Sequence, residues 1–256
     1  SVSFSGFCNF FRILFIIVSG LVGVSFGGTS LIANSIGEKN ITKIHGYFTH
    51  TIIYGLIVSI IITSTGLFFA PYLFHLMSSE FAVIQLGLSY TNVVFSGSIV
   101  FIMLVAINSL LHADGDTKTY RNVLILSFFL NILLNPLFIF GFGPIPAFGI
   151  SGIGIATVVA QSIGLIIVLI KASKSQRIEN ISLKDFKINL KLLTNLFFQS
   201  APISAALLLI SVGNFIILSY IGIFGEFATA GYGSAARFEQ ILLLPCLLYT
   251  SDAADE

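Results

Sequence analysis

The amino-acid sequence predicts an all-α protein that crosses a membrane several times as a helix bundle. Only 9% of its 256 residues are charged and 56% are hydrophobic. In a soluble domain about a quarter of the residues are charged, so this chain has too few charges to cover a surface that faces water. The chain also repeats apolar segments near the length of about 20 residues that a helix needs to cross a bilayer.

Six segments have this length, and a seventh begins near residue 228. In chain order they cover residues 10–34, 46–77, 84–111, 122–142, 148–170 and 194–223. Gly and Pro interrupt several of them, which membrane helices tolerate better than soluble helices do.

Small residues recur at every fourth position in two of these segments. They are Gly23 and Gly27 in the first, and Gly152, Ala156, Ala160 and Gly164 in the fifth. Small side chains at this spacing let two helix backbones approach closely in lipid. We therefore expect a tightly packed bundle.

The basic residues alternate between the connections in agreement with this count of spans. Ten of the twelve Lys and Arg residues follow the first, third or fifth span, namely Lys39, Lys43, Lys118, Arg121, Lys171, Lys174, Arg177, Lys184, Lys187 and Lys191. The intervening connections at 78–80, 143–146 and 222–226 contain none. Cytoplasmic loops carry the excess of Lys and Arg, so we expect the loops at 39–43, 118–121 and 171–191 to be cytoplasmic. The protein would then be a multi-pass protein of the plasma (inner) membrane.

The connection from Lys171 to Leu193 differs from the others because it is long and contains eight charged residues. Ser182 and Asp185 fit the Ser-x-x-Asp pattern of a capped helix start. Ile181, Phe186, Leu190 and Leu193 would line one face of a short helix on the membrane surface. Two interpretations stay open, a solvated connector or a linker between two helical lobes, and the length favours the linker.

The sequence contains no motif for phosphate binding, metal binding or hydrolytic catalysis. Cys8 and Cys246 form no disulfide framework or metal spacing, and the net charge of +1 gives no indication of a nucleic-acid partner. The four histidines lie at or near loop ends, where a solvated imidazole is ordinary; they are His45, His50, His75 and His112. Asp114 and Asp116 are expected to cap and solvate a turn. We expect no enzyme activity and no cofactor.

Uncharged polar residues inside the spans are the remaining candidates for function. Asn131 and Asn135 share a helix face because four residues make about one turn, and Pro136 frees the carbonyl of Ile132. Thr157 repeats this spacing with Gln161 on the next span, and other spans contribute Asn34, Asn108, Gln199 and Asn214. Amide, hydroxyl and carbonyl oxygens are ligands that can hold a desolvated cation. Hydrogen bonds between helices are the alternative role.

Several stretches resemble the multidrug and toxic compound extrusion (MATE) transporters. They are GGTSLIANSIGEKN, HADGDTKTYRNVLILSFFLNILLNPLFIFG, GISGIGIATVVAQ and FATAGYGSAARFEQILLLP. The resemblance follows the chain in order to Pro245. It implies a monomeric antiporter with twelve helices in two lobes of six, which exports small amphipathic or cationic compounds in exchange for H⁺ or Na⁺.

On this plan residues 1–170 supply helices two to six of the N-terminal lobe, 171–193 the cytoplasmic interlobe linker, and 194–245 helix seven and the start of helix eight. The chain would then be a fragment that lacks helix one and most of the C-terminal lobe. We expect residues 246–256 to be a translated sequencing adapter, because one frame of a transposase-type adapter reads CLLYTSDAAD, the sequence of residues 246–255.

The resemblance also implies site residues. The N-lobe cation site of the family uses an acid on helix one, an Asn/Asp pair four residues apart on helix five and a Thr on helix six, which Asn131, Asn135 and Thr157 match. Substrate would lie in the cleft between lobes, for which we select Asn34, Asn108, Gln161, Gln199 and Asn214. Position 135 is Asn where some members have Asp. The first half of helix seven, QSAPISAALLLISVGN, lacks the Glu of some sodium-driven members.

Two alternatives differ in the residues they need. A lipid-linked oligosaccharide flippase of related architecture would be favoured by cationic residues along the cleft, and only Arg12 and Arg237 lie within spans. An intramembrane enzyme would need paired acids or a nucleophile inside the bundle, and the sequence shows neither.

Overall fold

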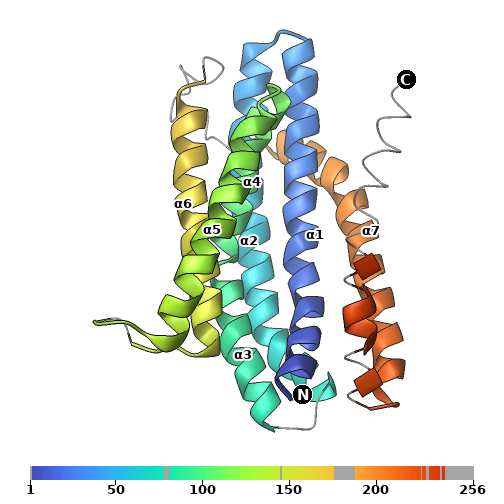
Figure 1. Ribbon diagram of the computed structural model, residues 1–256. Helices are drawn as coiled ribbons and strands as arrows, with labels where there is room; N and C mark the ends of the chain where they lie inside the picture. The colour runs from blue at the N-terminus through green and yellow to red at the C-terminus, as the bar shows by residue number, and fades with distance from the viewer. Residues whose placement is uncertain are drawn as a thin grey trace.

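The computed structural model describes residues 2–77, 81–144, 146–175 and 188–225, with shorter pieces at 227–228, 231–236 and 238–239. In this part of the chain seven helices form an elongated bundle (Figure 1): α1 (Val2–Gly37), α2 (Ile41–Met77), α3 (Phe81–Ser96), α4 (Ser98–Ala113), α5 (Thr117–Phe140), α6 (Ile150–Ser173) and α7 (Leu190–Gly222). The helix start proposed at Ser182–Asp185 and the adapter proposed at 246–256 lie outside the described residues.

Six stretches of the described chain are helical, long and apolar enough to cross a membrane. They are Ile17–Gly37, Ile41–Tyr72, Ile84–Ala113, Thr117–Phe140, Ile150–Ser173 and Leu190–Asn214. The prediction of an all-α membrane bundle with six spans in this order is confirmed. Most of the seventh span predicted from residue 228 lies outside the described residues, although residues 231–236 are helical.

The third span is interrupted, which the sequence did not indicate. Helix α3 ends at Ser96 and α4 begins at Ser98, with Gly97 between them. Thr63 of α2 supports the interruption, because its Oγ1 donates to the Phe95 carbonyl at 3.0 Å and lies 2.7 Å from Ser98 Oγ. A side chain at Gly97 would collide with Val158 of α6. The helix of the third span is therefore interrupted at the point where α2 and α6 approach it.

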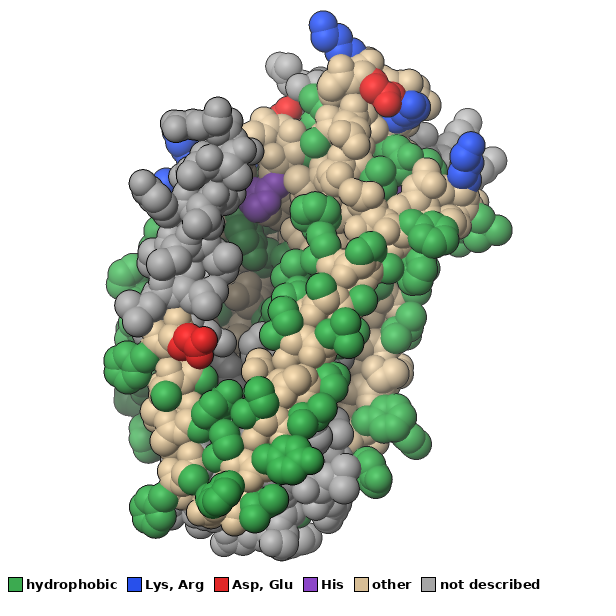
Figure 2. All heavy atoms as spheres, turned by 90° about the vertical axis from the view of Figure 1, so that its right-hand side faces the viewer, with side chains coloured by type: hydrophobic (Ala, Val, Ile, Leu, Met, Phe, Trp, Pro, Cys, Tyr) green, Lys and Arg blue, Asp and Glu red, His purple; other side chains and the backbone are tan. Residues whose placement is uncertain are grey.

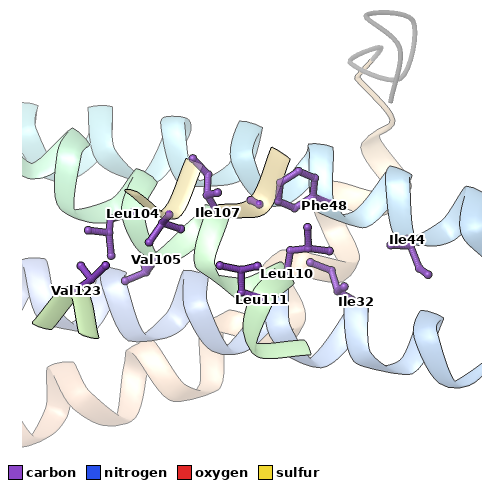
Figure 3. Close-up of a cluster of buried hydrophobic side chains, with 11 residues drawn as sticks. Ile32, Ile44, Phe48, Leu104, Val105, Ile107, Leu110, Leu111 and Val123 are labelled. Atoms are coloured by element: carbon purple, nitrogen blue, oxygen red, sulfur yellow. The ribbon is translucent and has the colours of Figure 1, made fainter. Parts of the chain in front are cut away.

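Helix α4 lies at the centre of the core. Two clusters of buried apolar side chains share it. In one, Ile102 and Ala106 of α4 pack with residues of α1, α2 and α3, and the other surrounds Leu104, Leu110 and Leu111. Figure 3 shows the second cluster, in which these α4 side chains lie among Ile32, Ile44, Phe48 and Val123. Two-thirds of the third span is buried, compared with 11% of the α5 span, so α5 presents most of its surface to the outside of the described bundle.

The small residues predicted to mediate close packing are buried. Gly152, Ala156, Ala160 and Gly164 all lie in the interior, and an added Cβ at Gly152 would lie 2.5 Å from the Phe138 carbonyl oxygen of α5. The backbones of α5 and α6 approach each other at Gly152 because no side chain separates them. Gly23 and Gly27 of α1 instead leave room for the side chains of Ser204 and Ser200 of α7.

The Lys and Arg side chains lie near one end of the bundle, and hydrophobic side chains cover its length (Figure 2). We call this the basic end; its described residues are Lys39, Lys43, Lys118, Arg121, Lys171, Lys174 and Lys191. Asp116 caps α5 there by accepting hydrogen bonds from the Thr119 backbone N–H at 3.0 Å and the Thr119 hydroxyl at 2.7 Å. These bonds favour the carboxylate and hold the pKa of Asp116 below its ordinary value.

Replacing Gly152 by Ala tests the close approach of α5 and α6. The new methyl group would meet the rigid backbone of Phe138, so we expect Gly152→Ala to lower the free energy of unfolding by about 1–3 kcal/mol. Thermal unfolding of the detergent-solubilised protein measures the change. Gly213→Ala in α7 is the matched control, because nothing lies within 4 Å of its added Cβ, and it should be neutral or slightly stabilising. Equal effects of the two substitutions would contradict the packing argument.

Candidate functional site

Helices α5 and α6 form a hairpin whose backbone fixes the candidate site. After α5 ends at Phe140, the backbone N–H of Phe148 donates to the Phe138 carbonyl at 2.9 Å, and that of Gly149 donates to the Ile139 carbonyl at 3.2 Å. The close approach at Gly152 then brings the first turns of α6 against the last turns of α5. As the helices run back along each other, Thr157 comes to lie beside Asn131.

Asn131 and Thr157 are in direct contact across the two helices. Thr157 Oγ1 lies 3.3 Å from Asn131 Oδ1 and 2.9 Å from the Ile153 carbonyl of its own helix. A hydroxyl has a single proton, so the shorter bond takes most of it and the contact with Asn131 is weak. The Asn131 amide Nδ2 donates to the Ser127 carbonyl at 2.8 Å. Its Oδ1 is therefore held in place but only weakly satisfied.

Two further oxygens of α5 lie on the same helix face without a partner. Ser127 precedes Asn131 by four residues and Asn135 follows it by four, and both Ser127 Oγ and Asn135 Oδ1 are buried with no hydrogen bond among the described residues. A buried polar oxygen without a partner is unfavourable by roughly 1–3 kcal/mol. Together with Asn131 and Thr157, these residues form what we call the α5–α6 oxygen cluster.

The α5–α6 oxygen cluster is electrically neutral. None of the seven helices contains Asp or Glu, and the described residues contain no group of three or more His, Cys, Asp or Glu side chains that could hold a metal ion. Amides and hydroxyls do not titrate in the physiological range. These side chains can supply oxygen ligands to a cation, but they cannot by themselves bind and release a proton.

Gln161 lies one turn beyond Thr157 on α6 and lines a cavity of about 440 Å³. The other walls come from α1, α4 and α5, and they are mainly apolar and aromatic: Val18, Leu21, Val22, Ser25, Phe26, Thr29, Phe101, Leu104, Val105, His112 and Tyr120. Thr29 Oγ1 is also buried without a partner. No Lys, Arg, Asp or Glu lies among these lining residues.

The other predicted cleft residues are distributed over the bundle. Asn108 of α4 is 1% exposed, and its Oδ1 has no partner in the described part of the chain. Gln199 of α7 donates from Nε2 to Ser30 Oγ of α1 at 3.1 Å, so it connects two helices. Asn34 near the end of α1 and Asn214 in α7 are exposed. The structure thus joins Asn131 with Thr157 directly and gives Asn34 and Asn214 no shared contact.

The expectation of a solvated imidazole is wrong for His50. This residue is 2% exposed, and both of its ring nitrogens have partners. Its position inside the apolar segment 46–77 was a signal for burial, because polar side chains inside a span are enclosed by protein. Ser127 was also missed, although it extends the Asn131–Asn135 spacing by one more turn.

Comparisons with known proteins agree with the geometry. Residues 1–137 match the family model MatE. The chain is 26% identical over 242 residues to the probable multidrug resistance protein YoeA of Bacillus subtilis (strain 168). The aligned region covers 93% of this chain and 52% of that protein. It is 25% identical over 245 residues to a FAD transporter of Shewanella oneidensis, covering 94% and 53%. The chain spans about half the length of these curated relatives.

Solved structures show the same likeness. An inward-facing multidrug resistance MATE family transporter of the MOP superfamily superposes with a TM-score of 0.85 and 25% identity, covering 95% of this chain and 55% of that chain. An outward-facing structure of such a transporter gives a TM-score of 0.81 and 26% identity, covering 93% and 52%.

Removing the Thr157 hydroxyl tests the contact between α5 and α6. Thr157→Val keeps the shape of the side chain and leaves Asn131 Oδ1 without its donor, so we expect a loss of about 0.6 kcal/mol in stability, the average for a hydrogen bond between membrane helices. Thr65→Val is the matched control, because Thr65 is exposed and its hydroxyl bonds only within α2. A thermal shift no larger than that of the control would show that the interhelical contact contributes nothing.

Proposed function

Because the chain belongs to the MatE family of MATE transporters, we propose that it is part of a cation-coupled antiporter that exports small amphipathic or cationic compounds by alternating access. Several relatives, such as the probable multidrug resistance protein YoeA, are named as drug transporters, which supports this class of cargo. The observation that carries the proposal is the α5–α6 oxygen cluster, a set of underused oxygens inside an otherwise apolar helix pair.

The oxygen cluster would act as the ligand set of the coupling cation. Inside a membrane an unsatisfied amide oxygen is costly, and a bound cation would relieve that cost at Asn131 Oδ1 and Asn135 Oδ1. Thr157 Oγ1 can turn a lone pair toward the cation while its O–H continues to donate to the Ile153 carbonyl. Oxygen ligands of this kind suit a hard cation.

Cation binding drives transport only if the outward-open and inward-open states bind the cation with different affinity. Asn131 and Thr157 lie on different helices and away from the hairpin bonds that join them. A small change in the angle between α5 and α6 therefore changes the distance between their oxygens, which is 3.3 Å here. We propose that the lobe uses this distance to couple cation binding to its change of state.

The coupling ion would be H⁺ or Na⁺. These two ions need different groups in addition to the neutral oxygen cluster. Na⁺ can be held by neutral oxygens together with a carboxylate, whereas H⁺ needs a titratable group. Since the seven helices contain no Asp or Glu, we propose that the charge comes from the helix-one acid that the family pattern implies, outside this chain.

Substrate would enter next to this cluster. Gln161 follows Thr157 by one turn and lines the apolar cavity bounded by α1, α4 and α5, which supports its place in the cleft. Gln199 and Asn108 remain proposed cleft residues on neighbouring helices, and Asn34 and Asn214 remain predictions without a supporting contact. The absence of Lys and Arg from the described cavity lining disfavours the flippase alternative. In the inner membrane, the basic end would face the cytoplasm.

Replacing both Asn131 and Asn135 by Leu tests the cation site. We expect the double variant, in the protein with all flanking sequence that its gene encodes, to lose coupled export while expression and folding persist, because Leu removes two oxygens and suits lipid better than Asn. Uptake of a fluorescent organic cation into inverted vesicles, which corresponds to efflux from the cell, is measured under an imposed Na⁺ gradient and, separately, an imposed pH gradient. The gradient that drives efflux in the parent protein identifies the ion.

The matched control is the double variant Asn92→Leu and Asn122→Leu. Both residues are exposed asparagines on spanning helices, so the chemical change is the same without the cluster. Control vesicles should keep the parent rate. Unchanged efflux after replacement of Asn131 and Asn135 would refute the cation-site assignment.

A further inference from the structure

The buried His50 side chain connects two parts of the chain that are far apart in sequence. Its Nδ1 lies 2.7 Å from the Gly46 carbonyl oxygen, and its Nε2 lies 2.8 Å from the backbone nitrogen of Asn189. A carbonyl can only accept and a backbone N–H can only donate. The ring must therefore carry its proton on Nδ1 and offer a bare Nε2, which is the neutral form of histidine.

The partner of His50 is the residue that starts α7. Asn189 is the N-cap of this helix, because its Oδ1 accepts from the Lys191 backbone N–H at 3.0 Å and its carbonyl accepts from Leu192 and Leu193. The backbone N–H groups at a helix start have no partner inside the helix. The ring of His50 satisfies the N–H of the cap residue itself, so the imidazole fixes the point at which α7 begins.

Further contacts hold the first half of α7 on the same surface. Asn195 Nδ2 donates to Tyr47 Oη of α2 at 3.1 Å, and a Cβ added at Gly46 would lie 3.2 Å from Leu192. Farther along, α7 lies beside α1 (Figure 1), where Gln199 bonds to Ser30 and the Ser204 hydroxyl donates to the Ser19 carbonyl at 3.1 Å. The contact at His50 is the first of this series along α7. In it, a backbone N–H donates to an imidazole nitrogen.

We propose that His50 is a proton-sensitive latch that holds the start of α7 against α2 at the basic end of the bundle. A protonated imidazole carries N–H groups on both nitrogens. Its Nε2–H would then face the Asn189 N–H, donor against donor, and the hydrogen bond at 2.8 Å could not persist. Protonation opens the latch, and deprotonation closes it.

Few titratable residues lie on the helices that carry this contact. Along α2 those nearest His50 in sequence are Lys43, His45, Tyr47 and Tyr54; Lys191 lies in the first turn of α7, and His112 lies in the last turn of α4. Helices α1, α2, α3, α4 and α7 contain no Asp or Glu. Glu38 in the turn before α2 is already paired with Lys43 at 2.6 Å. The helices packed on α2 therefore present no carboxylate to His50.

One proton on the imidazole decides whether the latch is open or closed, so the proposal predicts a response to the pH of the compartment at the basic end. The closed form requires the unprotonated ring, and docking of α7 weakens as the pH falls. This response does not depend on which compound or coupling ion the protein carries. A failure of the transport assignment would leave the latch intact, and the reverse also holds.

Crosslinking across the latch tests the proposal. Cysteines are introduced by Gly46→Cys and Leu192→Cys, with Cys8→Ser and Cys246→Ser to remove the native thiols, in the protein with all sequence its gene encodes, reconstituted in nanodiscs. A short bifunctional thiol reagent reports the proximity of α2 and α7. We expect the crosslinked fraction to fall at least about twofold from pH 8 to pH 5 relative to the same pair carrying His50→Gln.

The comparison with His50→Gln removes the effect of pH on thiol reactivity, because that effect is common to both proteins. Glutamine places a neutral acceptor near the position of Nε2, so its crosslinking should show only the thiol effect. His45→Gln is the matched control on the same helix and should keep the full pH response of the parent. His50→Lys should crosslink weakly at every pH. A parent protein that follows the His50→Gln curve at every pH, or a His45→Gln variant that loses the response, would overturn the proposal.

Discussion

The need to satisfy every polar group within an apolar bundle controls this structure. Ser and Thr hydroxyls inside the spans mostly bond back to their own helix, as Ser35, Thr51 and Ser162 do to carbonyls four residues earlier. The groups that reach another helix are few, and they mark the places where helices must keep a defined relation: Thr63 at the interruption of the third span, Thr157 beside Asn131, and the series along α7. Oxygens that remain unsatisfied, as at Asn135, are then the positions where a ligand is worth most.

Apolar packing provides the frame for these polar contacts. Helix α4 is enclosed by its neighbours, and both core clusters include its side chains. Helix α5 touches mainly α6 and leaves Phe128, Phe129 and Leu133 exposed. The oxygen cluster therefore lies on a sparsely covered helix and on the partner against which that helix packs, while the latch at His50 lies where α2 meets α7.

The sequence was sufficient for features that depend on periodicity or local composition. The six spans and the burial of the small residues from Gly152 to Gly164 follow from spacing along single helices. The grouping of Asn131 with Thr157 came from the family resemblance and not from spacing. Features that depend on which distant residue approaches could not be predicted. The interruption at Gly97 depends on Thr63 and Val158, and the partner of His50 lies 139 residues away. His50 itself was misjudged because proximity to a predicted loop was given more weight than its place in an apolar segment.

The close approach at Gly152 has a consequence for how such a protein can evolve. The spacing of Asn131 and Thr157 is set by backbone against backbone, through the hairpin bonds at Phe148 and Gly149, and not by the side chains that would hold an ion. Exchanging Asn for Asp at position 135 would thus alter the charge offered to an ion while leaving the spacing of the two helices unchanged. Descendants of one scaffold could change their ionic preference by single substitutions without a new fold.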